Sequence, residues 1–252
     1  MRVGVLGAGG RMGTTVCAAV AGDPDLELVA AVDPKASGRV EGIEIAATIE
    51  ALFEADAEVA VDFTEASAAR DNLRWLAEQG IHAVVGTTGM SAEDIEELAD
   101  LFGDGRANCI LAPNFAIGAV LLMKFAALAA PWFETGEIIE LHHDNKIDAP
   151  SGTAMLTAER MAEASSEWGD DPTTKEVAPG ARGGVAHGIH VHAVRMRGMV
   201  AHEEVILGTT GQTLVLRHDS YDRTSFMPGV LLAVKQVASR PGLTVGLDQL
   251  LD

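Results

Sequence analysis

The chain has 252 residues, and its 37 acidic side chains against 18 Lys and Arg give a formal net charge of −19. This charge argues against nucleic acid or an anionic membrane as a partner, because no basic surface is present to neutralise phosphates. Hydrophobic residues make up 48% of the chain, which predicts a folded globular protein with a sizeable core. No apolar run reaches the roughly 18 residues that span a bilayer, and the N-terminus lacks the apolar stretch of a signal peptide.

Acidic residues are concentrated in the first half of the chain. Residues 50–104 hold 14 acidic and 2 basic side chains, whereas residues 182–223 hold 5 Arg, 4 acids and 5 of the 8 His. This asymmetry predicts two domains with different tasks. Cys17 and Cys109 both lie in apolar contexts, which predicts buried free thiols in a reducing cytoplasm and no disulfide.

Residues 1–112 alternate apolar, β-rich runs with helical segments. Buried strands that alternate with helices indicate a parallel sheet covered on both faces, a Rossmann-like doubly wound α/β domain. A Ser91 N-cap with Asp94 three residues later marks the start of one helix. Strands are predicted at 3–6, 26–32, 59–63, 81–85 and 108–111, and the other helices at 12–21, 49–55 and 66–79.

The pattern changes from residue 136 onward. Longer strands interrupted by a single helix predict an antiparallel or mixed sheet in a second, α+β domain, with strands at 137–143, 190–195, 203–207 and 213–217 and the helix at 153–165. The segment 170–188 is rich in Gly, Pro and Asp and is expected to be a loop. An apolar helix at 228–238 closes the chain. The predicted first domain is therefore 1–113 plus 223–252, and the second is 114–222.

A glycine-rich turn follows the first predicted strand and opens the first helix. Its glycines stand at Gly7, Gly10 and Gly13, with Gly9 in addition, which is a GxxGxxG variant of the GxGxxG pattern. Glycines let backbone N–H groups and the positive end of a helix approach a pyrophosphate. Asp33 ends the second strand, where an acid binds ribose hydroxyls, so the pattern predicts dinucleotide binding.

The choice between NADH and NADPH stays open. The carboxylate of Asp33 favours NADH because it repels a 2′-phosphate, but Lys35 and Arg11 are cations placed to face such a phosphate. Two further turns, 85–89 and 112–115, follow strands. They are expected beside the nicotinamide, because ligands of doubly wound sheets lie beyond the carboxyl ends of the strands.

The segment 140–154, ELHHDNKIDAPSGTA, carries the densest functional pattern. His142, His143 and Lys146 lie within five residues, where a strand meets a loop. A helix then starts at residues 151–153, and its free N–H groups form an anion site. A cation, an acid–base imidazole and an anion-binding helix end suit an anionic substrate that must accept a proton.

Together these motifs resemble the 4-hydroxy-tetrahydrodipicolinate reductase family, the dihydrodipicolinate reductases of bacterial diaminopimelate and lysine biosynthesis. The resemblance covers nearly the full chain through GAGGRMG, DFT at 62–64, VVGTTG, APNFAIG, ELHHDNKIDAPSGTA and HDSYDRTSF. It implies hydride transfer from NADH or NADPH to a cyclic unsaturated dicarboxylate, giving tetrahydrodipicolinate and water. It further implies a cytoplasmic homotetramer, with a dinucleotide-binding first domain and a second domain for substrate binding and oligomerisation.

The resemblance also implies roles for individual residues. His142 is the acid–base residue and Lys146 the proton donor, and the substrate is contacted by His143, Ser151, Gly152 and Thr153. With Lys35 added from the charge argument above, the expected cofactor-binding residues are Gly7, Ala8, Gly9, Gly10, Arg11, Met12, Asp33, Lys35, Gly86, Thr87, Thr88, Ala112, Pro113, Asn114 and Phe115. Asp33-Pro34-Lys35 departs from the family pattern of an acid followed by Arg, which leaves the cofactor preference open.

Three alternatives are weighed against this interpretation. Another two-domain dehydrogenase shares the nucleotide half but has no need of the His142, His143 and Lys146 cluster. A non-catalytic NAD(H)-sensing protein gives no reason for that cluster either. A metal hydrolase is disfavoured, and no metal is expected, because His190 and His192 have no carboxylate or thiol at ligand spacing.

Overall fold

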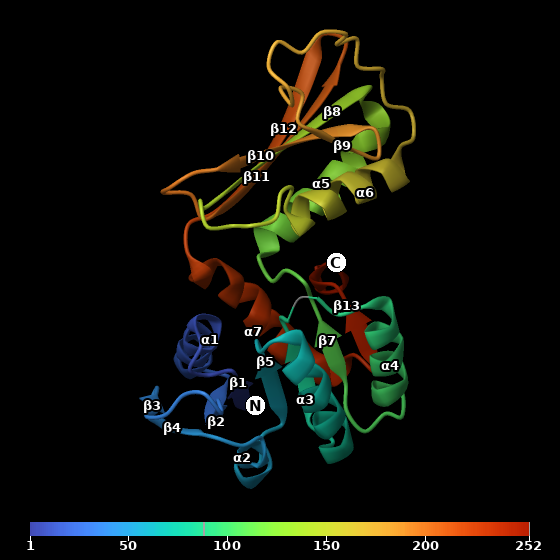
Figure 1. The fold of residues 1–252 in the computed structure, drawn as a ribbon. Helices are drawn as coiled ribbons and strands as arrows, with labels where there is room; N and C mark the ends of the chain where they lie inside the picture. Colours follow the sequence, from blue (N-terminus) through green and yellow to red (C-terminus); the bar gives the residue numbers. More distant parts are fainter. Residues whose placement is uncertain (88, 252) are drawn as a thin grey trace. The chain divides into compact units, whose positions relative to one another are not determined.

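The computed structural model describes residues 1–87 and 89–251 and divides the chain into two units (Figure 1). Unit 1 comprises Met1–Ile117 and Arg223–Asp252, and unit 2 comprises Gly118–Asp222. The first boundary lies a few residues beyond the expected position at 113. The reason is that Phe115 and Ala116 are buried, and a side chain at Gly229, in the returning helix, would collide with the Phe115 carbonyl.

Unit 1 is built on an eight-stranded sheet with the strand order β13-β7-β6-β5-β1-β2-β4-β3. All neighbours are parallel except β3 and β4. The strands are β1 (Arg2–Leu6), β2 (Glu27–Val32), β3 (Arg39–Val40), β4 (Ile43–Ala46), β5 (Val59–Asp62), β6 (His82–Val85), β7 (Cys109–Leu111) and β13 (Leu243–Val245). The predicted parallel, doubly wound sheet is confirmed.

The helices of unit 1 cover this sheet. They are α1 (Arg11–Gly22), α2 (Glu50–Glu54), α3 (Ala66–Gln79), α4 (Ala92–Phe102) and α7 (Met227–Gln236), with 3₁₀ turns η2 (Arg223–Phe226), η3 (Val237–Ser239) and η4 (Leu247–Leu250). The predicted capping box of α4 is present, because Ser91 and Asp94 exchange side chain-to-backbone hydrogen bonds. One core cluster packs α3 and α4 onto the sheet through Leu73, Leu76 and Phe102.

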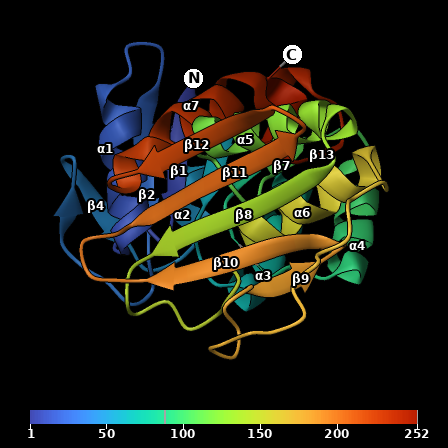
Figure 2. The ribbon, with the colours of Figure 1, turned by 90° about the horizontal axis from the view of Figure 1, so that it is seen from above.

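Unit 2 holds a five-stranded mixed sheet with the order β12-β11-β8-β10-β9 (Figure 2). Its strands are β8 (Thr135–His142), β9 (Gly184–Ala186), β10 (Ile189–Arg195), β11 (Ala201–Thr209) and β12 (Gln212–Ser220). β10 runs parallel to β8, and the other pairs are antiparallel. The helices α5 (Ile117–Ala129), continued by η1 (Ala130–Trp132), and α6 (Gly152–Ala164) lie on one face of the sheet. The predicted mixed sheet is confirmed.

Four strands and one helix were not expected from the sequence. β3, β4 and β13 have two to four residues each and lie at the edges of the large sheet. β9 lies within the segment predicted to be a loop. Such short strands depend on the neighbour that pairs with them, so their own residues carry little signal. The missed helix α5 is apolar along nearly its whole length and lacks the polar face that marks an amphipathic helix.

The two cysteines agree with the predicted free thiols. Cys17 and Cys109 are both buried and unpaired, and burial raises the pKa of the Cys17 thiol to about 12. No helix within the described ranges is long and apolar enough to cross a membrane.

The turn between β1 and α1 depends on a glycine at position 13. A Cβ atom at Gly13 would lie 2.0 Å from the Gly7 carbonyl oxygen, which is backbone and cannot move aside. We expect Gly13→Ala to lower the free energy of unfolding by about 1 to 3 kcal/mol through this overlap. The measurement is urea denaturation of the full chain, with unfolding monitored by circular dichroism.

Gly22 supplies the matched control, because it lies in the same helix and a Cβ there meets no atom within 4 Å. Gly22→Ala is expected to leave stability unchanged or to raise it by about 0.4 to 1 kcal/mol. Equal effects of the two substitutions would contradict the collision argument.

Candidate active site

The glycine turn of unit 1 leaves the start of α1 open to an anion. Gly7 adopts a left-handed φ of +74°, and the N–H groups of Gly7 and Ala8 donate to the Val32 carbonyl at 2.8 and 3.1 Å. Gly10 is the N-cap of α1 and carries no side-chain cap. The N–H groups of Arg11 and Met12 lie in the first turn of α1 and therefore have no helical partner, which leaves them available to a phosphate.

Asp33 ties this turn to the end of β2. One of its carboxylate oxygens accepts from the N–H of Gly9 at 3.1 Å, and the other accepts from the N–H of Lys35 at 2.8 Å. A Cβ at Gly9 would lie 2.2 Å from the Ala36 side chain, so the close approach requires glycine. The acid is thus held at the end of β2, where a dinucleotide-binding sheet places its ribose-binding carboxylate.

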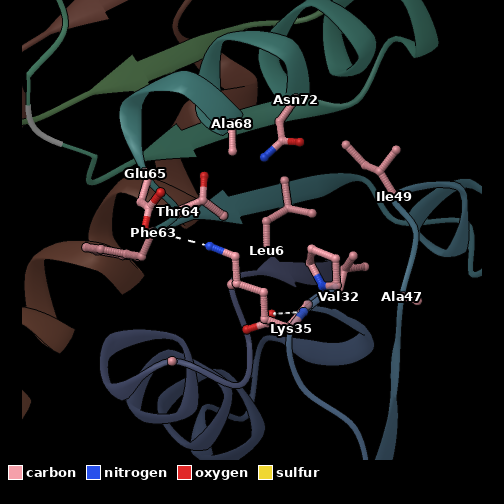
Figure 3. A pocket seen from close by; sticks show the side chains of 14 residues that line it. Leu6, Val32, Lys35, Ala47, Ile49, Phe63, Thr64, Glu65, Ala68 and Asn72 are labelled. Carbon is pink, nitrogen blue, oxygen red and sulfur yellow. Dashed lines mark hydrogen bonds and ion pairs between the residues drawn. The ribbon is translucent and has the colours of Figure 1, made fainter.

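A cavity of about 460 Å³ opens beside the turn (Figure 3). Four of the predicted cofactor residues line it: Gly7, Gly10, Asp33 and Lys35. The Lys35 ammonium lies 3.8 Å from Glu65, and both side chains are about 80% exposed, so water weakens this ion pair. Figure 3 shows the Lys35 side chain reaching across the cavity toward Glu65.

Sequence reasoning missed the opposite wall of this cavity. Ile49, Phe63, Thr64, Ala68 and Asn72 line it from α3 and from the segments before α2 and after β5. The available signal was that residues 63–65 follow a parallel strand at its carboxyl end, as Asp33 does. The cavity is bounded by a side chain-free turn, a carboxylate and apolar residues, which together fit a dinucleotide.

Buried Asp62 organises the residues after β5. Its carboxylate accepts from the backbone and hydroxyl of Thr64 at 2.7 and 2.6 Å and from Asn72 at 2.8 Å. Burial raises the pKa of Asp62, and these hydrogen bonds oppose the rise. The Thr87 hydroxyl donates to the Thr64 carbonyl at 2.9 Å, which links the second predicted turn to this one.

The two other predicted turns lie next to Phe63 rather than in the cavity wall. A Cβ at Gly86 would lie 2.0 Å from the Phe63 ring, and the Phe115 ring lies 5.8 Å from it, centroid to centroid. Asn114 accepts from the N–H of Ala116 at 2.9 Å, which fixes the turn after β7. Thr88 lies outside the described residues. Ala8, Gly9, Arg11, Met12, Thr87, Ala112 and Pro113 belong to the same three turns but do not line the cavity.

In unit 2, His142 is held by a fully buried carboxylate. His142 ends β8, and its Nδ1 lies 2.6 Å from Glu140, two residues earlier on the same face of the strand. Glu140 also receives both guanidinium nitrogens Nη1 and Nη2 of Arg195, at 2.7 and 2.8 Å, and the N–H of Ser151 at 2.9 Å. Three separate segments thus meet at one carboxylate.

The charges around this carboxylate shift two pKa values. Burial on its own would raise the pKa of Glu140, but the hydrogen bonds from Arg195 and His142 outweigh it and hold the pKa below its usual range. Burial lowers the pKa of His142 by disfavouring the imidazolium, and Glu140 opposes this only in part. At neutral pH His142 is therefore neutral. With Nδ1–H directed to Glu140, its Nε2 carries the free lone pair.

Lys146 is not a free cation in this structure. Its ammonium group donates to both carboxylate oxygens of Asp148 at 2.8 Å, and this contact lowers the pKa of Asp148. Asp148 is half exposed, so an incoming anion has access to the pair. His143, the other predicted substrate residue, is exposed beside the loop.

The start of α6 is the predicted anion site. Ser151 is buried and caps the helix by accepting from the N–H of Ala154 at 3.2 Å. Gly152 is exposed, and a Cβ there would meet nothing within 4 Å. The N–H groups of Gly152 and Thr153 lie in the first turn, where a helix leaves donors unpaired. His142, Lys146 and this helix start therefore lie in one short segment of unit 2, between the end of β8 and the start of α6.

Sequence reasoning did not identify Glu140 and Arg195 as site residues. Glu140 opens the ELHH motif, so its alternation with His142 on a strand was a usable signal. Arg195 lies 55 positions from Glu140, and only the parallel pairing of β10 with β8 brings it there. Its Nε is buried without a partner among the described residues.

The histidines considered as a metal pair do have carboxylate partners in the fold. His192 contacts Glu137, and His190 lies 3.1 Å from Asp171. Both carboxylates also bind Arg182, so this is a mixed-charge network on the sheet. Within the described ranges, no three His, Cys, Asp or Glu side chains are grouped as a metal site.

Comparison with known proteins places both units in one family. Residues 1–115 match the family model "Dihydrodipicolinate reductase, N-terminus", and residues 118–251 match "Dihydrodipicolinate reductase, C-terminus". The chain is 52% identical to a 4-hydroxy-tetrahydrodipicolinate reductase of Corynebacterium aurimucosum, over 100% of this chain and 98% of that protein. It is 50% identical to the enzyme of that name from Mycolicibacterium vanbaalenii, over 100% of this chain and 99% of that protein.

A solved structure agrees with this result. The dipicolinate-bound dihydrodipicolinate reductase of Paenisporosarcina sp. TG-14 is 38% identical, with a TM-score of 0.90 over 99% of this chain and 98% of that chain. Both halves of the sequence, the full-length identities and the shared fold agree. This chain belongs to the dihydrodipicolinate reductase family.

Proposed function

We propose that this chain reduces 4-hydroxy-tetrahydrodipicolinate with NADH or NADPH, giving tetrahydrodipicolinate and water, in diaminopimelate and lysine biosynthesis. The observation that carries this proposal is the arrangement in unit 2. A neutral, carboxylate-bound His142, a Lys146 ammonium and an open helix start lie within one short segment. Relatives about 50% identical over their full length bear the name of this activity.

The cationic groups of unit 2 suit a dicarboxylate. The unpaired N–H groups of Gly152 and Thr153, at the positive end of α6, are assigned to one substrate carboxylate, together with the Ser151 cap. We assign His143 to contact substrate from its exposed position. An arriving carboxylate exchanges with Asp148 for the Lys146 ammonium, so the enzyme replaces one ion pair with another and leaves no charge buried alone.

Lys146 and His142 handle protons in this proposal. NADH or NADPH supplies the hydride when it is bound by the glycine turn, Asp33 and the residues of the two other turns in unit 1. Lys146 stabilises the negative charge that develops on the substrate ring and then donates a proton to it. His142 accepts or returns a proton at Nε2, and Glu140 holds the ring in that tautomer.

The test removes the Lys146 ammonium. The substrate is generated in place by a synthase acting on pyruvate and aspartate semialdehyde, and NADH and NADPH oxidation are followed separately. Lys146→Ala is expected to lower turnover on the order of 10²-fold or more, because both charge stabilisation and the proton are lost.

Lys175, in the exposed segment before β9, provides the control, and Lys175→Ala is expected to keep normal turnover. Near-normal turnover of Lys146→Ala would remove Lys146 from its proposed role. A wild-type chain that binds the dinucleotide but oxidises neither form would instead support the NAD(H)-sensing alternative.

Asp33 is proposed to set the cofactor preference. Its carboxylate favours ribose hydroxyls and repels a 2′-phosphate, so Asp33→Asn is expected to raise the KM for NADH relative to that for NADPH. A single charge contact near water is worth about 1 kcal/mol, which corresponds to a change of roughly fivefold in the ratio. Lys35→Ala is expected to shift the ratio in the opposite direction. An unchanged ratio in both variants, measured by steady-state kinetics, would argue against this assignment.

We further propose that unit 2 assembles four copies of the chain, which operate in the cytoplasm. The proposal is supported by the sheet face opposite α5 and α6 (Figure 2), where Ile139, Leu141, Ile206 and Val215 alternate with the inward-facing residues. Such a partly exposed apolar face is typical of subunit interfaces. Sedimentation velocity is expected to give the mass of four chains, and a monomer at micromolar concentration would refute the tetramer.

A further inference from the structure

Glu203 is a second buried carboxyl group in unit 2 to which the proposed mechanism assigns no role. It lies on β11 and is 5% exposed. Its neighbours Val205 and Leu207, at every second position, belong to the core cluster under α5 and α6, so Glu203 faces the same helices. In the sheet it stands directly opposite Glu140 on β8 and His218 on β12.

The hydrogen bonds around Thr157 determine where the Glu203 proton lies. The Thr157 hydroxyl on α6 contacts both the Thr153 carbonyl, at 3.0 Å, and a carboxyl oxygen of Glu203. A hydroxyl group has one hydrogen, and a carbonyl can only accept. When Thr157 donates to Thr153, the contact with Glu203 needs a hydrogen from the carboxyl group. When Glu203 is protonated each contact has a hydrogen of its own, whereas an ionised Glu203 would have to share the single Thr157 hydrogen with the Thr153 carbonyl.

The surroundings of Glu203 do not favour a carboxylate anion. Glu140 faces Glu203 from β8. The nearby cation, Arg195, is already bound to Glu140 through two nitrogens. From β12 it faces His218, and burial lowers the pKa of that imidazole, so it is neutral at neutral pH. The buried residues of α6 (Ala154, Thr157, Ala158, Met161) and of α5 (Ala119, Val120, Leu122, Met123, Ala126) contain no titratable side chain.

We infer that Glu203 is a positioning residue that keeps a proton in the substrate-binding enzyme and, through Thr157, fixes the first turn of α6. The chain of contacts runs from the Glu203 carboxyl to the Thr157 hydroxyl and on to the Thr153 carbonyl. Thr153 belongs to the helix start assigned above to a substrate carboxylate, so this inference rests on the proposed function.

Loss of the proton has two effects on a dianionic ligand. The Thr157 hydrogen turns to the Glu203 carboxylate and releases the Thr153 carbonyl, and a second negative charge appears beside Glu140, behind the anion site. Burial raises the pKa of Glu203 to about 7. The carboxyl group is therefore protonated below this pH and ionised above it, and ligand affinity falls as the pH rises through 7. Burial lowers the pKa of His142 below its ordinary value, so this imidazole is already neutral as the pH rises above 7.

The experiment measures binding of dipicolinate to the NADH-loaded full chain by isothermal titration calorimetry from pH 6 to pH 9. Wild-type affinity is expected to fall on the order of tenfold across this range. Glu203→Gln mimics the neutral carboxyl group and can donate an N–H to Thr157. We expect this variant to bind within about twofold of wild type at pH 6 and about tenfold more tightly than wild type at pH 9.

Two further variants distinguish the Glu203–Thr157–Thr153 contacts from general effects of a substitution in this part of unit 2. Glu159→Gln removes an exposed carboxylate from the same helix α6 and is expected to retain the wild-type pH dependence. Thr157→Val keeps the side-chain shape but removes the hydroxyl, and it is expected to weaken binding at pH 6 at least threefold. Lys146 and His143 are present in every variant, so they contribute equally to both sides of each comparison.

Infrared spectroscopy measures the protonation state of the Glu203 carboxyl group directly. At pH 6 the difference spectrum between wild type and Glu203→Gln is expected to contain one carboxylic acid C=O band, which disappears by pH 9. An absent band, a pH dependence that Glu203→Gln shares with wild type, wild-type binding by Thr157→Val, or a Glu203→Gln chain that fails to fold would each overturn the inference. Failure of the wild-type chain to bind dipicolinate at any pH would instead refute the proposed function.

Discussion

The proposed catalytic segment depends on one buried ion pair, the one between Glu140 and Arg195. Glu140 has no exposed surface, and an unpaired carboxylate there would carry a large desolvation penalty. The bidentate guanidinium of Arg195 offsets that penalty, and the remaining capacity of the carboxylate is taken by His142 and the N–H of Ser151. The same carboxylate therefore orients the imidazole and anchors the residue that caps α6. Removing either charge of the pair would disturb both at once.

This arrangement explains how the loop between β8 and α6 is held in position although it has no hydrophobic core of its own. The loop carries Lys146 and Asp148 on its exposed side, and Arg195 also donates to the Asp148 carbonyl at 2.6 Å. β8 and β10 pair in parallel, so the side chain of Arg195 lies beside the loop that follows β8. The sheet of unit 2 thus holds this loop from one side, while α6 begins where the loop ends. Glu203, one strand further on β11, likewise contacts α6 from the sheet, through Thr157.

The charge distribution is consistent with a local cationic site in an acidic protein. The dense acidic segment 50–104 belongs to unit 1, whereas the groups proposed for the dicarboxylate belong to unit 2. In unit 1 the groups proposed to bind the pyrophosphate are backbone N–H groups at the start of α1, which a net negative chain can still offer to an anion. Net charge therefore limits nonspecific partners and says little about either site.

The sequence by itself determined the two-part organisation, the doubly wound sheet, the glycine turn with Asp33, and the His142–Lys146–Ser151 segment. These features depend on short-range patterns: buried strands alternating with helices, glycine spacing, and an N-cap that follows a His/Lys loop. The short edge strands β3, β4 and β13 escaped prediction because pairing with a neighbour defines them. The helix α5 escaped because it has no polar face to reveal its period. Only the tertiary structure decided that Arg195 reaches Glu140 and that Thr157 links Glu203 to Thr153. Contacts across 46 or 55 positions arise from strand register and helix packing, and local sequence carries no record of them.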